Sequence, residues 1–212
     1  MPSRARPSRA RLAVLLSGSG TNLQALLDTI AADAGFGGEV VVVASDRADA
    51  FGLERAQQAG IETVVEPLSD HADRDGWEAA LRKAIEVHRP DIVVLAGFMR
   101  ILSGAFLAGW PDRVVNTHPS LLPAFRGANA VADALAYGVK VTGSTVHLVD
   151  EQVDHGPIVA QRAVAVLEGD TQQSLHERIK AAEHELLPAC VKLLCRDRIE
   201  VTGRHVHLRE EA

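Results

Sequence analysis

The stretch LAVLLSGSGTN, residues 12–22, determines the fold, because it combines a strand, a turn and the start of a helix. The apolar run Leu12 to Leu16 is typical of a strand that is buried on both faces. The segment 17–20 predicts a glycine-rich loop, and Thr21-Asn22 opens a helical pattern of apolar residues. A strand, a loop and a helix in this order form the repeating unit of α/β proteins.

The same alternation recurs through the first half of the chain. Buried strands are predicted at 40–44, 61–65 and 92–96, and helices at 48–59 and 75–88. Crossovers between parallel strands are right-handed in nearly all proteins. We therefore expect an α/β fold with an open, mostly parallel twisted sheet, helices on both faces and a Rossmann-like N-terminal half.

The rhythm changes in the C-terminal half. A helix is predicted at 130–137, and two strands at 141–149 and 158–166 are separated only by turn residues, which predicts antiparallel neighbours. A long helix follows at 171–194, with Asp170 as its expected N-cap. The segment 199–208 is expected to add an edge strand. We predict one domain over residues 12–212, after a disordered basic tail over residues 1–11.

Composition limits the possible classes of function. The chain has 212 residues, 47% of them hydrophobic, and a formal net charge of −6, which argues against a nucleic-acid partner. No apolar stretch is long enough for a membrane span or a secretory signal. Cys190 and Cys195 are interpreted as reduced packing residues of a cytoplasmic protein. We expect a monomer or a homodimer.

Three polar residues are the candidates for catalysis. Asn116 and His118 end a predicted strand, and the period of two sends both side chains to one face, before Pro119 stops the strand. Asp154 lies in the turn between the two later strands. An amide, an imidazole and a carboxylate can hold, protonate and deprotonate a tetrahedral intermediate of acyl transfer. Taken singly, Asn116 could instead cap a turn, and His118 could be a structural histidine.

Two further segments are candidates for binding. The loop before Thr21 can receive a phosphate at a helix N-terminus, although it matches neither the dinucleotide fingerprint nor the P-loop, and a plain turn is the alternative. Segment 94–102 could hold a flat heteroaromatic ligand, or it could simply pack in the core. His205 and His207 lack a third metal ligand nearby, so no metal site is expected.

The residues taken together resemble the phosphoribosylglycinamide formyltransferase family, which moves a formyl group from 10-formyltetrahydrofolate to the amine of glycinamide ribonucleotide. The resemblance runs from about Leu12 to at least Glu200, and it implies a formyltransferase fold. It implies these two small molecules as substrates, the folate as co-substrate and no metal. The motifs that carry it are SGSGTN, ASDRADAFGLERAQQAGI, VVLAGFMRILS, NTHPSLLP, STVHLVDEQVDHGPIVAQ and AAEHELLP.

The resemblance also implies roles for individual residues. Asn116, His118 and Asp154 would be the catalytic set. Contacts to the ribonucleotide would come from Gly20, Thr21, Asn22, Arg74 and Glu183. The folate pocket would comprise Phe98, Met99, Arg100, Ile101, Leu102, Val149 and Asp150, within a loop that continues to Asp154.

Two departures from the family pattern stand out. Arg126-Gly127-Ala128-Asn129 replaces a Pro-Gly-x-His stretch, and His155 stands where relatives have small or hydroxylated residues. The first departure leaves open how this loop contacts the substrate, and the second leaves open whether titration beside Asp154 is altered. The alternatives are a formyltetrahydrofolate hydrolase and a non-catalytic nucleotide-binding module. Methionyl-tRNA formyltransferase shares the catalytic trio, but the length and the acidic charge disfavour it.

Overall fold

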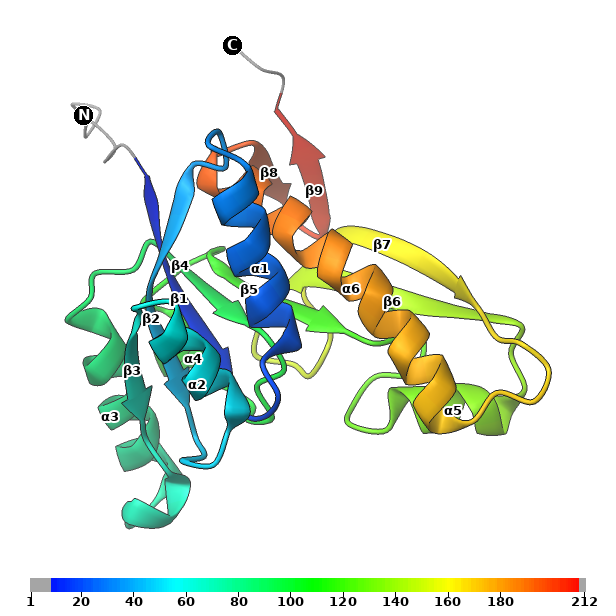
Figure 1. Cartoon of the computed structure of the whole chain (residues 1–212), viewed down its shortest axis with the longest axis horizontal. Helices are drawn as coiled ribbons and strands as arrows, with labels where there is room; N and C mark the ends of the chain where they lie inside the picture. Colours follow the sequence, from blue (N-terminus) through cyan, green and yellow to red (C-terminus); the bar gives the residue numbers. More distant parts are fainter. Residues whose placement is uncertain (1–8, 210–212) are drawn as a thin grey trace.

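Seven strands form one sheet in the order β3-β2-β1-β4-β5-β6-β7 (Figure 1). The structure is a computed structural model that describes residues 9–209. The strands of this sheet are β1 Ala10–Leu16, β2 Gly38–Ser45, β3 Glu62–Val65, β4 Ile92–Leu95, β5 Val114–His118, β6 Val141–Leu148 and β7 Ile158–Ala165. The helices are α1 Thr21–Ala32, α2 Phe51–Gln58, the 3-10 turn η1 Leu68–Asp70, α3 Arg74–Glu86, α4 Gly104–Leu107, α5 Ala130–Tyr137 and α6 Gln172–Cys195.

The pairing of the strands confirms the predicted fold class. Neighbours from β3 to β5 are parallel, whereas β6 is antiparallel to β5 and β7 is antiparallel to β6. The antiparallel pair follows from the short turn between β6 and β7, which leaves no room for a crossover helix. The sheet is therefore parallel in its N-terminal half and antiparallel at its C-terminal edge.

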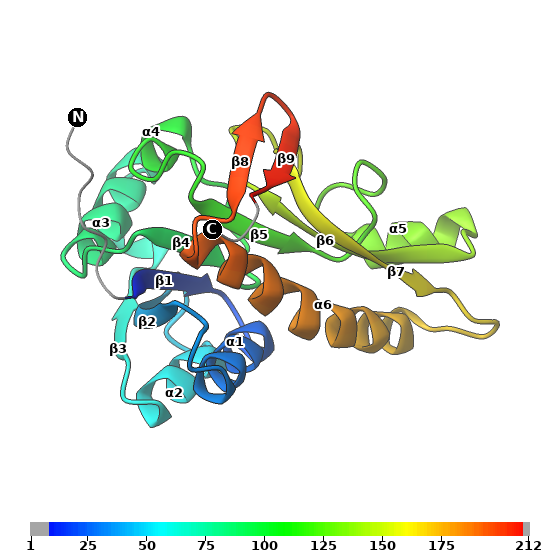
Figure 2. The same ribbon diagram turned by 90° about the horizontal axis from the view of Figure 1, so that it is seen from above.

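Helices cover both faces of the sheet (Figure 2). Along β1, Leu12, Val14 and Leu16 belong to one apolar cluster, and Ala13 and Leu15 belong to another, as the period of two requires. The first cluster packs against α1, α2 and α6, and the second packs against α3 and α4. This double burial explains why the β1 sequence is continuously apolar.

The order of the strands reverses direction at β1. Successive strands go to one side of β1 as β2 and β3, and then to the other side as β4 and β5. At such a reversal, the loops after two neighbouring strands diverge and leave a binding crevice at their carboxyl ends. Here these are the loops after β1 and β4, and they are joined where the Ser17 amide donates to the Gly97 carbonyl at 3.1 Å.

The start of α6 corrects one prediction. Thr171, rather than Asp170, is the N-cap, because its hydroxyl accepts from the Ser174 amide in a reciprocal capping box. Asp170 instead forms an ion pair with Arg178 at 2.9 Å, and its carboxylate also accepts from the Leu167 amide. The hydrogen bond from Arg178 is the largest of the effects that hold the pKa of Asp170 well below its usual range.

The C-terminal segment corrects another prediction. Instead of an edge strand of the main sheet, it forms a separate hairpin of β8 Ile199–Thr202 and β9 His205–Leu208. The chain reverses at Gly203, whose φ of +60° is in the left-handed region that glycine tolerates. This turn breaks the continuous strand that the alternation of side chains suggested.

Several boundaries also differ from the predictions. β1 begins at Ala10, inside the predicted tail, and residues 1–8 of that tail lie outside the described residues. Helix α2 begins at Phe51 rather than residue 48, because Ala50 is extended. No helix within residues 9–209 has the length and apolar character needed to cross a membrane.

A close approach of two glycines fixes the loop after β1. The Gly52 amide of α2 donates to the Gly18 carbonyl at 3.0 Å. A Cβ on Gly52 would lie 2.4 Å from Leu16 Cδ2 and 3.1 Å from Gly20 Cα, and a Cβ on Gly20 would lie 2.5 Å from Gly52 Cα. Neither position has room for a side chain.

We therefore predict that Gly52→Ala destabilises the protein. Overpacking costs about 1–3 kcal/mol, which exceeds the gain of at most about 1 kcal/mol that alanine brings to a helix. Urea unfolding should show the loss as a lower midpoint. Gly18→Ala is the control, because a Cβ there meets no atom within 4 Å. Equal midpoints for the two variants would contradict the packing argument.

Candidate active site

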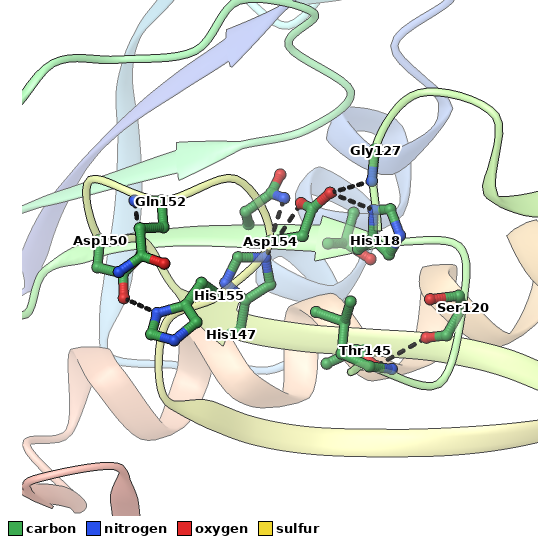
Figure 3. A network of polar contacts seen from close by, with 12 residues as sticks. His118, Ser120, Gly127, Thr145, His147, Asp150, Gln152, Asp154 and His155 are labelled. Carbon is green, nitrogen blue, oxygen red and sulfur yellow. Dashed lines mark hydrogen bonds and ion pairs between the residues drawn. The ribbon is translucent and has the colours of Figure 1, made fainter. Parts of the chain in front are cut away.

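Two strands and one loop bring the three predicted catalytic residues together. Asn116 and His118 lie on β5, which ends at His118 as predicted, and they pair with His147 and Thr145 of β6. Asp154 lies in the loop between β6 and β7, and its Oδ2 is 3.3 Å from His118 Nδ1. Figure 3 shows the carboxylate of Asp154 directed toward the imidazole of His118.

His118 is held between two oxygen acceptors. Its Nε2 lies 2.8 Å from the Phe125 carbonyl, and its Nδ1 faces Asp154. A neutral imidazole can donate to only one of these oxygens, whereas an imidazolium can donate to both. Burial lowers the pKa of His118, and this outweighs the Phe125 carbonyl and the Asp154 charge, which raise it. The site thus makes the proton on His118 easy to give up.

Asp154 is stabilised as a carboxylate. Burial raises its pKa, but contacts with His147, the Gly127 amide and His118 together lower it below the ordinary value. The Gly127 amide donates to Oδ2 at 2.8 Å, and His147 Nε2 lies 3.8 Å from Oδ1. Asp154 therefore stays ionised at neutral pH and can accept a proton.

His147 is a residue of this site that the sequence reasoning missed. It is buried in β6, and its Nδ1 donates to the Leu148 carbonyl at 2.8 Å. That proton leaves Nε2 as an acceptor for the amide nitrogen of Asn116 at 3.2 Å. The contact orients the Asn116 side chain. The available signal was a lone imidazole between the apolar residues Val146 and Leu148.

A second polar cluster holds the loop after β5. Thr145 Oγ1 donates to the Ser120 carbonyl at 2.7 Å and accepts from the Leu122 amide at 3.1 Å. The Gln161 amide group also reaches Thr145 Oγ1 and the Leu122 carbonyl, each at 2.9 Å. These bonds fix the chain directly after His118 (Figure 3).

The glycine loop lies at the N-terminus of α1, as predicted. Gly20 is the N-cap residue with φ +69°, so the first amides of α1 face the crevice end of β1. Asn22 Nδ2 donates to Glu183 Oε2 of α6 at 3.0 Å, which brings together two residues distant in sequence. Burial raises the pKa of Glu183. Asn22 Oδ1 is buried without a hydrogen-bond partner.

The predicted folate segment after β4 divides into two sets. Phe98 and Leu102 are buried, and Phe98 stacks on Trp77 with 6.3 Å between ring centroids, so core packing is their observed role. Met99 and Ile101 are 70% and 53% exposed and are therefore available to a ligand. The segment thus has three exposed residues, 99–101, between the two buried side chains of Phe98 and Leu102.

A buried acidic group ties the same segment to β1 and β2. Asp46, at the end of β2, accepts from Arg100 Nε at 2.7 Å and from the Ser17 hydroxyl at 2.6 Å. The Met99 amide donates to that hydroxyl at 2.9 Å. The loop after β4 is therefore fixed to the start of the glycine loop.

Arg74 lies at the start of α3. Its guanidinium donates to the Ile101 carbonyl and lies 3.5 Å from Glu78 of the same helix. Among described residues, its polar contacts are thus with the folate segment and with α3. Its contact with the ribonucleotide stays a prediction.

The loop after β6 carries the remaining predicted residues. The Val149 amide donates to the Val114 carbonyl at 2.9 Å, which anchors the loop to β5. Asp150 Oδ2 lies 2.6 Å from His155 Nδ1, and its Oδ1 accepts from the Gln152 amide at 3.0 Å. Within residues 9–209, no group of three or more His, Cys, Asp or Glu could hold a metal ion.

Comparison with known proteins places this geometry in a family. The model of the family described as formyl transferase matches residues 10–191. Over 204 residues the chain is 50% identical to phosphoribosylglycinamide formyltransferase of Mycobacterium tuberculosis, covering 96% of this chain and 94% of that protein. It is 46% identical over 189 residues to the trifunctional purine biosynthetic protein adenosine-3 of Bos taurus, covering 89% of this chain and 19% of that protein.

A solved structure agrees with these matches. Glycinamide ribonucleotide transformylase 1 from Symbiobacterium toebii superposes with a TM-score of 0.93 at 46% identity. The superposition covers 97% of this chain and 96% of that chain. The likeness therefore extends over the whole fold, including both halves of the sheet.

The first prediction from this geometry concerns the charge of His118. Asp154→Asn removes a negative charge that raises the pKa of His118, so the pKa should fall further below its ordinary value. Titration of the imidazole nitrogens by NMR measures it. Asp150→Asn is the matched control, because Asp150 contacts His155 instead. An unchanged or higher His118 pKa in Asp154→Asn would exclude the interaction.

The second prediction concerns the buried Glu183. Its folded-state pKa is raised above about 4.5, so ionisation costs stability as the pH rises above that value, and the cost is complete above the folded pKa. Glu183→Gln retains an acceptor for Asn22 and should melt at a higher temperature than the unaltered protein near pH 8. The difference should shrink toward pH 4.

Thermal unfolding across this range is the measurement. Glu185→Gln serves as the control, because Glu185 is exposed and pairs with Arg162 on the surface. A Glu183→Gln variant that is less stable than the unaltered protein near pH 8 would show that ionised Glu183 contributes favourably to the fold.

Proposed function

Because the chain belongs to the formyl transferase family, we propose that it transfers a formyl group from 10-formyltetrahydrofolate to the amine of glycinamide ribonucleotide, a step of purine biosynthesis. The observation that carries the proposal is the convergence of Asn116, His118 and Asp154 at the end of β5. These three groups match the needs of acyl transfer from a leaving nitrogen to an attacking amine.

Asn116 would stabilise the oxyanion of the tetrahedral intermediate. When the amine attacks the formyl carbon, the formyl oxygen becomes negative, and an amide N–H directed at it contributes roughly 3 kcal/mol in comparable sites. One amide hydrogen is used in the contact with His147, which leaves the other free to point at the substrate. His147 therefore acts as a positioning residue.

His118 and Asp154 would move the protons. The attacking amine loses a proton as the new C–N bond forms, and the folate nitrogen gains one as the old C–N bond breaks. Asp154, which stays ionised, accepts the first proton directly or through a water. His118, when protonated, donates the second, and its lowered pKa makes that transfer easier.

The two substrates would bind on either side of this centre. The ribonucleotide phosphate would meet the N-terminus of α1, and Glu183, held by Asn22, would meet the ribose hydroxyls. The folate would lie against the exposed part of the segment after β4 and the loop after β6. Proposed ribonucleotide residues are Gly20, Thr21, Asn22, Arg74 and Glu183, and proposed folate residues are Phe98, Met99, Arg100, Ile101, Leu102, Val149 and Asp150.

Phe98 and Leu102 would serve the folate pocket indirectly. Both are buried, so their contribution is to hold the backbone that presents Met99 and Ile101. A cytoplasmic location and a monomeric or homodimeric state remain predictions from the sequence. The same holds for the independence of the reaction from any metal.

An assay for formyl transfer tests the proposal. Purified protein is mixed with glycinamide ribonucleotide and 10-formyltetrahydrofolate, and loss of the formyl group from the folate is followed with and without the amine. We expect consumption that requires the amine. Asp154→Asn should lower kcat by about 10²-fold to 10⁴-fold, because the proton acceptor is lost.

Asp133→Asn, on the exposed surface of α5, is the control for loss of a carboxylate and should keep full activity. Consumption of the folate in water alone would indicate a hydrolase. Absence of any consumption, with both substrates still bound, would indicate a non-catalytic nucleotide-binding module. Full activity of Asp154→Asn would remove the assigned role of Asp154.

A further inference from the structure

The C-terminal hairpin contacts the loop that carries Asp154. Arg204 lies at the turn between β8 and β9, outside the main sheet. Its Nη2 donates to the His155 carbonyl at 2.6 Å, and its Nη1 lies 3.1 Å from His155 Nε2. The guanidinium therefore contacts both the backbone and the side chain of His155, the residue that follows Asp154.

The contact extends through His155 to a second residue of the loop. His155 Nδ1 lies 2.6 Å from Asp150 Oδ2, and this bond is drawn in Figure 3. Arg204 Nη1 lies 3.1 Å from Nε2 and 3.4 Å from Nδ1 of the same ring, so the guanidinium contacts the imidazole beside both of its nitrogens. Arg204, His155 and Asp150 thus form one continuous series of polar contacts across the loop.

The two ends of this loop are fixed independently of the hairpin. The Val149 amide donates a hydrogen bond to the Val114 carbonyl of β5, and the Leu148 amide donates to the Pro157 carbonyl at 2.8 Å. Gly156 packs so closely on the backbone that a Cβ there would lie 1.9 Å from the Leu148 carbonyl oxygen. The backbone of the loop is therefore held to its neighbours at both ends, by residues 148–149 and 156–157.

The middle of the loop has fewer attachments. Among described residues, the polar contacts that tie residues 150–155 to other elements are those of Asp154 in the candidate active site and those of Arg204. Asp154 also has a φ of +49°, a left-handed conformation that is unfavourable for a residue other than glycine. Such a conformation persists only where its surroundings hold it.

We propose that Arg204 is a positioning residue that holds the loop over residues 150–155, and with it Asp150 and Asp154, in the form that receives the folate. This inference rests on the proposed function. The His155 side chain extends the link to Asp150, because its ring contacts both Asp150 and Arg204. The hairpin thereby becomes part of the folate side of the site.

Hydrogen exchange and kinetics of Arg204→Ala test the proposal. We expect faster amide exchange at residues 150–155, and a KM for 10-formyltetrahydrofolate that rises roughly threefold to fivefold, as suits one exposed charge-assisted contact. The KM for the ribonucleotide and the melting temperature should stay unchanged. Arg204→Lys keeps a donor for the His155 carbonyl, so its amide exchange and its KM for the folate should lie between those of Arg204→Ala and the unaltered protein.

His205→Ala is the matched control, because His205 is an exposed neighbour in the same hairpin whose described ring contact is with His207. Unchanged exchange at residues 150–155 in Arg204→Ala would overturn the proposal. Equal rises in both KM values, together with a lower melting temperature, would show a purely structural role and also overturn it. If the unaltered protein transfers no formyl group, the proposed function fails, while the exchange measurement still decides whether Arg204 holds the loop.

Discussion

The ionised carboxylate of Asp154 is the interaction on which the candidate site depends. It lies within reach of His118 at 3.3 Å, accepts from the Gly127 amide at 2.8 Å and faces His147 at 3.8 Å. These contacts come from β5, from the segment after it and from β6, so one carboxylate joins three parts of the chain. Burying a charge is costly, and here the hydrogen bond from the Gly127 amide is one of the contacts that lower the pKa of the carboxylate against the effect of burial.

This interaction requires the particular pairing of β5 with β6. Because the pair is antiparallel, residues opposite one another are fixed by register, and Asn116 faces His147 across the ladder. A slip of one residue would turn the imidazole to the other face of the sheet and leave the Asn116 amide unoriented. The antiparallel strand β6 therefore supplies His147 to a candidate site whose other strand, β5, belongs to the parallel half of the sheet. The parallel half supplies the crevice, where the loops after β1 and β4 meet.

Local patterns were sufficient to predict most of the fold and to single out Asn116, His118 and Asp154, which the structure brings close together. Buried strands are short apolar runs, and Pro119 marks the end of β5, so both can be recognised without knowledge of the tertiary structure. The folate segment was harder, because its alternation between buried Phe98 and exposed Met99 depends on how α3 covers the sheet. The contact of Arg74 with the Ile101 carbonyl was also not foreseen, because a long side chain at a helix start can reach several loops, and only packing decides which.

Three further features of the structure differ from the sequence predictions: the N-cap of α6, the role of His147 and the C-terminal hairpin. Asp170 and Thr171 are both good N-caps, and Arg178, nearly two turns into α6, engages the aspartate and leaves Thr171 as the cap. His147 was missed because a histidine in an apolar strand is ordinarily structural. Its role appears only when the register places Asn116 opposite. The hairpin of β8 and β9 depends on one left-handed glycine, and a sequence pattern does not reveal that conformation.

The segment from Arg126 to Asn129 shows how a departure from a family pattern can preserve the chemistry. The group that contacts Asp154 there is the backbone amide of Gly127, so the neighbouring side chains can differ without loss of that hydrogen bond. What the contact does require is the backbone conformation, and the φ of +91° at Gly127 is one that glycine adopts readily. The constraint on this segment therefore acts on one glycine rather than on a histidine side chain. The same reasoning applies to His155, whose side chain adds a link to the hairpin while the neighbouring carboxylate of Asp154 keeps its own partners.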